Sequence, residues 1–149
     1  MSVSREVTMF EQIGGYEPLH RLVEYWYGTV LSDPLLQPLF GQGHADHIPH
    51  LTTFFAEVFG GPTDYTDQLG GFAALLAPHR GKRIGEDQRL RFIELFELAA
   101  DRTGFPEDVR LRTALHDYLE FGTQVATQNS HASTDAELHP CQEVPHWRP

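Results

Sequence analysis

Residues 18–31 read PLHRLVEYWYGTVL, and their apolar side chains recur three or four positions apart. This spacing places one stripe of side chains on the same face of an α-helix: Leu19, Leu22, Val23, Trp26, Tyr27, Val30 and Leu31. Pro18 suits the first helical turn, where a missing N–H costs little. Asp33-Pro34 ends the helix because a proline disfavours helical geometry in the residue before it. The stretch therefore predicts a helix over residues 18–31 with one buried face.

The same periodicity predicts three more long helices along the chain. They run over residues 45–59, from about residue 85 to the break at Gly104, and from Pro106 through Val125. A compact apolar turn over residues 35–40, a loop over 63–71 and a short helix over 72–77 connect them. No segment shows sustained two-residue alternation, so no sheet is expected. The sequence predicts one all-α domain over residues 1–128 and a polar, flexible tail over residues 129–149.

Composition excludes several classes of partner. The chain has 149 residues, a formal net charge of −10 and a pI near 5.2. Nucleic acids and anionic membranes are bound through Lys and Arg, so this charge argues against both. The first residues lack the apolar stretch of a signal peptide, and no run has the length of a transmembrane helix. The single cysteine, Cys141, forms no disulfide within the chain, and we expect a cytoplasmic protein.

His79 is the residue most suggestive of a cofactor. It follows an apolar patch (Phe72, Leu75, Leu76) and precedes a basic one (Arg80, Lys82, Arg83). An imidazole that binds haem iron needs an apolar cleft for the macrocycle and cations for its two propionates. An ordinary exposed loop histidine fits the same spacing, and the two interpretations stay open at this point.

Tyr27 and three histidines are further candidates with alternatives. Tyr27 lies on the inward stripe, as a core residue or as a hydrogen-bond donor into an apolar cavity. His44, His47 and His50 recur at steps of three, which favours either a zinc site or separate roles at the edge of a pocket. No phosphate-binding loop and no nucleophile motif accompany them.

From residue 10 to residue 128 the chain resembles the truncated haemoglobins, group II in particular. The resemblance rests on motifs that occur in the family's order and spacing: Ile13-Gly14-Gly15, Trp26-Tyr27, Asp33-Pro34-Leu35-Leu36, Phe40, His47 with Leu51, Phe54-Phe55, Gly60-Gly61-Pro62 with Tyr65, His79 with Arg83-Ile84, and Asp117-Tyr118-Leu119-Glu120. The resemblance implies a truncated globin-like two-on-two helical sandwich around haem b.

The resemblance also implies a role for each site residue. His79 is expected to bind the iron, and Tyr27 and His47 to face the bound gas. Apolar walls are expected from Phe40, Leu51, Phe54, Phe92 and Phe96, and contacts to the propionates from Arg83 and His50.

Two positions depart from the group II pattern. Members of this group usually carry at position 92 a tryptophan whose indole N–H points at the ligand, whereas this chain has Phe92, which donates nothing. Pro78 stands directly before the expected iron ligand, where a helical residue is commoner. Both departures bear on ligand affinity and reactivity, and neither removes the iron ligand.

The function that these expectations imply is reversible binding of oxygen and other diatomic gases. Nitric oxide or peroxide chemistry at the haem, fed by an electron-donating reductase, is left open, and so is the choice between a monomer and a homodimer. A haem-based gas sensor acting through its tail is one alternative. A haem-free helical protein with zinc at His44, His47 and His50 is the other.

Overall fold

The computed structural model describes residues 7–134 and 144–149, and the regular elements within these ranges are all helical. They follow one another as α1 (Met9–Ile13), α2 (Tyr16–Ser32), α3 (Gln37–Phe40), α4 (His47–Val58), α5 (Asp64–Gln68), α6 (Gly71–Leu76), the 3-10 helix η1 (Ala77–His79), α7 (Glu86–Arg102) and α8 (Val109–Ser130). Cys141 lies outside the described residues.

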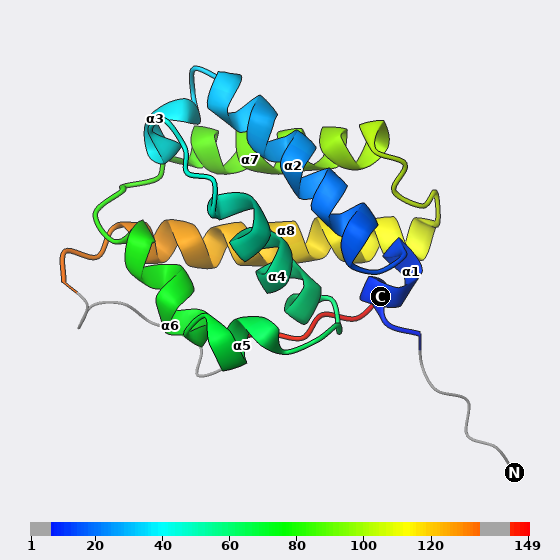
Figure 1. Cartoon of the computed structure of the whole chain (residues 1–149). Helices are drawn as coiled ribbons and strands as arrows, with labels where there is room; N and C mark the ends of the chain where they lie inside the picture. The colour runs from blue at the N-terminus through cyan, green and yellow to red at the C-terminus, as the bar shows by residue number, and fades with distance from the viewer. Residues whose placement is uncertain (1–6, 135–143) are drawn as a thin grey trace, which may run out of the picture.

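Four long helices form two crossed layers. In Figure 1, α7 and α8 run side by side behind α2 and α4, which cross in front of them. The largest sets of contacts between helices join α2 to α4, α2 to α7, and α7 to α8. This arrangement is the two-on-two helical sandwich that the resemblance implies, so the predicted fold class is confirmed.

Helix α2 extends the predicted helix by two residues at its start and one at its end. Its apolar stripe is buried, with Leu19, Val23 and Val30 at 0% exposure. The chain turns where the sequence predicts, because the Asp33 carboxylate accepts the N–H groups of Leu35 (2.9 Å) and Leu36 (3.3 Å). The buried stripe of α2 is therefore the side that faces the other helices.

Helix α5 corrects the expectation of a loop over residues 63–71. The cause is a contact with α4, where Glu57 is only 2% exposed. The Glu57 carboxylate accepts the backbone N–H of Thr66 at 2.9 Å and also its hydroxyl. A buried carboxylate on the preceding helix thus satisfies groups near the middle of a short helix that has no apolar periodicity of its own.

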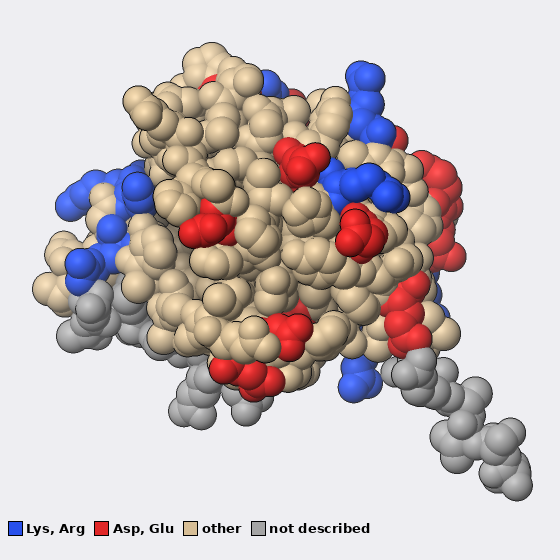
Figure 2. Space-filling view, viewed as in Figure 1, with Lys and Arg blue, Asp and Glu red and all other residues tan. Residues whose placement is uncertain are grey.

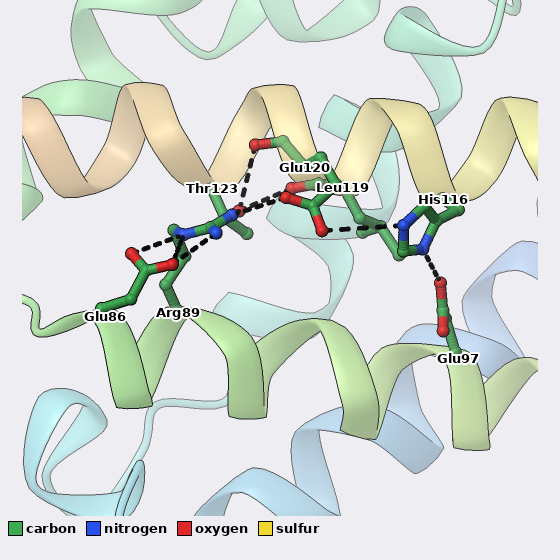
Figure 3. Close-up of polar contacts among 7 residues, drawn as sticks. All are labelled: Glu86, Arg89, Glu97, His116, Leu119, Glu120 and Thr123. Atoms are coloured by element: carbon green, nitrogen blue, oxygen red, sulfur yellow. Dashed lines mark hydrogen bonds and ion pairs between the residues drawn. The ribbon is translucent and has the colours of Figure 1, made fainter.

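Charged side chains join α7 to α8 (Figure 3). Arg89 on α7 is 8% exposed, and its guanidinium donates to Glu86 (2.6 Å), to Glu120 (2.9 Å) and to the Thr123 hydroxyl (3.2 Å). Farther along, His116 contacts both Glu97 (2.5 Å) and Glu120 (3.6 Å). The two back helices are therefore linked by a chain of ion pairs as well as by apolar packing.

The end of the chain differs from the expected division at residue 128. Helix α8 continues to Ser130. Residues 144–149 pack on the helical domain: Val144 is 3% exposed, and the backbone N–H of Trp147 donates to the carbonyl of Val58 at 2.6 Å. The Trp147 ring also contacts Tyr118 and Phe121 of α8. Part of the expected tail is thus docked near the end of α4.

Within the described part of the chain, none of the helices combines the length and the apolar character that crossing a membrane requires.

Candidate functional site

His79 lies at the last residue of η1, where α6 gives way to a tighter helix. Pro78 has no N–H to continue the α-helical pattern, and it stands in the first turn of η1, where that loss is tolerated. The His79 imidazole turns back along the helix, and its Nδ1–H donates to the carbonyl of Leu75 at 2.9 Å. This bond fixes the orientation and the tautomer of the ring.

The tautomer of His79 leaves Nε2 as the lone-pair atom. No described residue forms a hydrogen bond with Nε2. Burial lowers the pKa of His79 below its ordinary value, and nearby Lys82 lowers it further, whereas the bond to Leu75 opposes both. A neutral imidazole with one nitrogen bonded to a carbonyl and the other unused is the form that binds a transition metal.

Tyr27 and His47 meet between α2 and α4. The Tyr27 hydroxyl is hydrogen-bonded to Nδ1 of His47, and it accepts the backbone N–H of His44 at 3.1 Å. Burial, followed by the neighbouring His44 and His50, lowers the pKa of His47. A neutral His47 that accepts the Tyr27 hydrogen at Nδ1 carries its own proton at Nε2. The pair therefore offers the Nε2–H of His47 as a hydrogen-bond donor to a small molecule beside it.

Aromatic rings surround this polar pair. Phe40 packs edge-on against Tyr27, with ring centroids 5.9 Å apart, and against Trp26 at 6.0 Å. Phe92 packs against Trp26 at 4.7 Å. Phe40 and Phe92 are both only partly buried, so each ring keeps a side that no described residue covers. The structure thus brings Tyr27, His47, Phe40 and Phe92 to one region.

Two expected wall residues lie deeper. Phe54 is 3% exposed and contacts Phe55 and Tyr65. Phe96 is fully buried, and it stacks behind Phe92 and contacts Trp26. Phe96 thus supports the region from behind, whereas the ring contacts described for Phe54 are with its neighbour Phe55 and with Tyr65 of α5.

Large apolar side chains remain partly exposed on α3, α4, α6, α7 and α8. They pack on the core with one side and leave the other uncovered: Phe40, Ile48, Leu51, Leu75, Phe92 and Val125. Neither a described hydrogen bond nor a described ring contact joins His79 to Tyr27 or His47. His79 and the Tyr27–His47 pair are therefore two separate groups of side chains. Each has apolar neighbours that are only partly covered.

A basic segment follows His79. Figure 2 shows Lys and Arg side chains gathered at the edge of the molecule where the connector between α6 and α7 lies. Within it, Arg83 has a left-handed backbone (φ 50°), which is costly for a residue other than glycine. Its N–H donates to the Ser130 carbonyl (3.0 Å), and the next N–H, of Ile84, donates to the Ser130 hydroxyl (2.9 Å). The end of α8 thus holds this strained turn in place.

The two residues expected to contact propionates are both at the surface. Arg83 and His50 are exposed, the first on the basic connector and the second on α4, one turn beyond Asp46. Their positions leave both side chains accessible to an anionic group.

The zinc alternative gains no support from the described residues. No group of three or more His, Cys, Asp or Glu side chains among them comes together as a metal site. His44 turns toward Asp46, whose backbone N–H it accepts at 3.1 Å, whereas His47 turns toward Tyr27. The His44 and His47 rings lie near each other, with centroids 5.7 Å apart, but their Nδ1 atoms face different partners.

Some parts of the site escaped the sequence analysis. The carbonyl of Leu75 and the backbone N–H of His44 belong to the main chain, which leaves no trace in the residue pattern. Gly43 is the exception: a Cβ there would lie 3.0 Å from the Tyr27 hydroxyl and 2.9 Å from Leu31, at a positive φ of 81°. The glycine is required because the loop passes so close to Tyr27.

The chain matches the model of the bacterial-like globin family over residues 8–127. Among solved structures, the group II truncated haemoglobin of Bacillus anthracis is 27% identical, with a TM-score of 0.74, over 83% of this chain and 92% of that chain. The truncated oxygen-avid haemoglobin of Bacillus subtilis is 28% identical, with a TM-score of 0.70, over 79% of this chain and 97% of that chain.

A curated relative shows the same similarity from sequence alone. The group 1 truncated haemoglobin of Nostoc commune is 30% identical over 105 residues, which are 64% of this chain and 89% of that protein.

Proposed function

Because this chain belongs to the bacterial-like globins, whose cofactor is haem b, we propose that it holds the haem between His79 and the Tyr27–His47 pair and binds oxygen there. The observation that carries the proposal is the His79 imidazole, whose Nδ1 is bonded to the Leu75 carbonyl while Nε2 is left for iron. The name of the oxygen-avid relative from Bacillus subtilis supports oxygen as the gas.

The chemistry of the residues fits this cofactor. A haem needs an imidazole on one face, apolar side chains around the macrocycle and cations near the propionates. His79 supplies the first, and the partly exposed Phe40, Leu51 and Phe92 supply the second. For the propionates we propose Arg83 and His50, both of which are accessible at the surface.

Each side chain then has a role when the site is filled. Haem supplies the iron at which the gas binds. His79 anchors the iron, while the buried rings of Phe54 and Phe96 keep the walls in place. The Nε2–H of His47 would donate a hydrogen bond to the gas, and the Tyr27 hydroxyl would do so by turning its single hydrogen from His47 to the gas; both bonds would slow release. The surrounding apolar rings exclude water, which strengthens these hydrogen bonds.

Slow release of oxygen suits reactive chemistry better than bulk oxygen storage. We propose conversion of nitric oxide or peroxide as the further activity of the same site, with electrons from a reductase. A cytoplasmic location belongs to the same proposal, since one cysteine allows no disulfide within the chain.

Visible absorption spectra of protein expressed with ample haem precursor test the proposal. Ferric, ferrous and carbon monoxide forms of the wild type are compared with His79→Ala. His20→Ala serves as a control at a histidine that stacks on Tyr16 near the start of α2. We expect a histidine-ligated haem spectrum that His79→Ala loses and His20→Ala keeps. A folded, helical wild type that stays colourless would overturn the assignment.

A further inference from the structure

Trp26 carries a buried polar hydrogen that has no partner. Its side chain is 1% exposed, and no described residue accepts a hydrogen bond from its indole Nε1–H. Buried N–H groups are paired in the great majority of cases, because an unpaired one loses its hydrogen bond to water and gains nothing in return. An unpaired indole N–H in the core therefore requires an explanation.

The position of Trp26 supplies one. Its ring contacts Phe92 (4.7 Å between centroids), Phe40 (6.0 Å) and the neighbouring Tyr27 (6.3 Å). These three side chains belong to the region proposed above for the bound gas, and Tyr27 is bonded there to His47. Trp26 thus lies directly behind this region on the α2 side, in contact with the partly exposed rings of Phe40 and Phe92.

Of the other donors in this region, the Tyr27 hydroxyl is already engaged, whereas the Nε2–H of His47 is not. The single hydrogen of the Tyr27 hydroxyl is shared with His47, and the Tyr27 oxygen accepts the N–H of His44. The indole hydrogen of Trp26 is not committed to any described acceptor. A phenylalanine would fill a purely apolar position without the cost of burying an N–H.

We propose that the indole N–H of Trp26 is a hydrogen-bond donor to the small ligand in this pocket, with a diatomic gas as its acceptor. This inference rests on the proposed function. It makes Trp26 a residue that determines specificity among gases, because it favours the gas that accepts hydrogen bonds more strongly.

The two tryptophans of the chain allow a direct test by nuclear magnetic resonance. Trp26 contacts rings of the proposed gas-binding region, and Trp147 packs on α8 against Tyr118 and Phe121. Haem-loaded protein with isotope-labelled indole nitrogens gives one N–H signal from each, and Trp26→Phe identifies which is which. Samples saturated with carbon monoxide and with oxygen are compared, because both are diamagnetic and oxygen is the stronger hydrogen-bond acceptor.

We expect the Trp26 signal to move between the two gases while the Trp147 signal stays in place. A Trp26 signal that is the same with both gases would overturn the inference, and would mean that the indole N–H faces a neighbouring ring such as Phe92 or Phe96.

Dissociation rates give a second, independent readout. Loss of one neutral hydrogen bond corresponds to a rate change of about three- to tenfold. We expect Trp26→Phe to speed oxygen dissociation by that factor and to change carbon monoxide dissociation much less, while Trp147→Phe changes neither. An equal change for both gases would show that Trp26 only supports the packing. A wild type that takes up no haem would contradict the proposed function itself. A wild type that takes up haem, but in which Trp26→Phe leaves oxygen dissociation unchanged, would contradict only this inference.

Discussion

The Tyr27 hydroxyl and Nδ1 of His47 form a hydrogen bond that joins α2 to α4. The same oxygen accepts the N–H of His44 at the start of the loop into α4. One phenol therefore holds both the histidine and the loop that precedes it. The Tyr27 hydroxyl has a single hydrogen, which it gives either to His47 or to a bound ligand. Removal of the His47 side chain would therefore leave this hydrogen free for the ligand.

Tyr27→Phe is expected to speed oxygen dissociation by about ten- to a hundredfold in the haem-loaded protein. The reason is the loss of a hydrogen bond to a polarised ligand, worth roughly 1.5 to 3 kcal/mol. Stopped-flow displacement of oxygen by carbon monoxide measures the rate. Tyr25→Phe on the exposed side of the same helix is the control, and an unchanged rate in Tyr27→Phe would leave Tyr27 as a core residue only.

Acidification is expected to destabilise the protein through His47. Burial lowers the pKa of His47 below the ordinary 6.5, so the unfolded chain binds this proton more readily than the folded chain. The stability contributed by the neutral ring is fully present above about pH 6.5 and is lost as the pH falls toward the lowered pKa of the folded state. Urea unfolding measured across this pH range should show that acidification lowers the free energy of unfolding less in His47→Gln than in the wild type.

His116 serves as a comparison because its pKa is shifted in the opposite direction to that of His47. Contact with Glu97 raises its pKa, so its contribution to stability is present below the unfolded pKa and is lost as the pH rises through the raised one. His116→Gln should therefore lower stability on the acid side. The effect should be small because the side chain is half exposed. If His47→Gln and His116→Gln changed the pH dependence in the same direction, the explanation by burial of His47 would be wrong.

Arg89→Met is expected to lower the free energy of unfolding by about 1 to 2 kcal/mol. Methionine keeps much of the apolar stem but leaves Glu120 and Thr123 without their shared donor. The loss is modest because the Glu86 and Glu120 side chains remain partly hydrated, at 65% and 35% exposure. Chemical denaturation measures it, with Glu94→Gln in an exposed pair as a control that should change stability by less than about 0.5 kcal/mol.

Trp147→Ala is expected to lower the free energy of unfolding by about 2 kcal/mol. The half-buried ring covers Tyr118 and Phe121, and alanine would expose them. Trp147→Phe should recover most of the loss, since it keeps a ring against both. Equal stability of wild type and Trp147→Ala would show that residues 144–149 contribute nothing to the fold in solution.

The long helices were predictable from the sequence because their apolar spacing records one buried face. Helix α2 differs from its predicted range by two residues at one end and one at the other, and α4 lies within its predicted range. Helix α5 was missed because its support comes from Glu57, a residue of another helix. The docking of Trp147 was missed because its contacts are with residues far away in the sequence.

The candidate site shows the same division. The surroundings of His79 and the inward position of Tyr27 are visible in the residue pattern, and the resemblance adds His47 as their partner. The bond between Tyr27 and His47, and the turn of the His79 ring toward Leu75, depend on side-chain orientation, which spacing does not encode. The unpaired N–H of Trp26 is invisible for that reason too, because at the sequence level it is one more apolar residue on a buried stripe.

The bond from Trp147 to Val58 also has a consequence for synthesis in the cell. Helix α4, which carries His47, receives this bond to a carbonyl at its end from a residue near the other end of the chain. On a ribosome, α4 emerges before Trp147 does, and the end of α4 stays without that partner until Trp147 has been made. This contact of α4 therefore forms only after all the long helices of the sandwich have been synthesised.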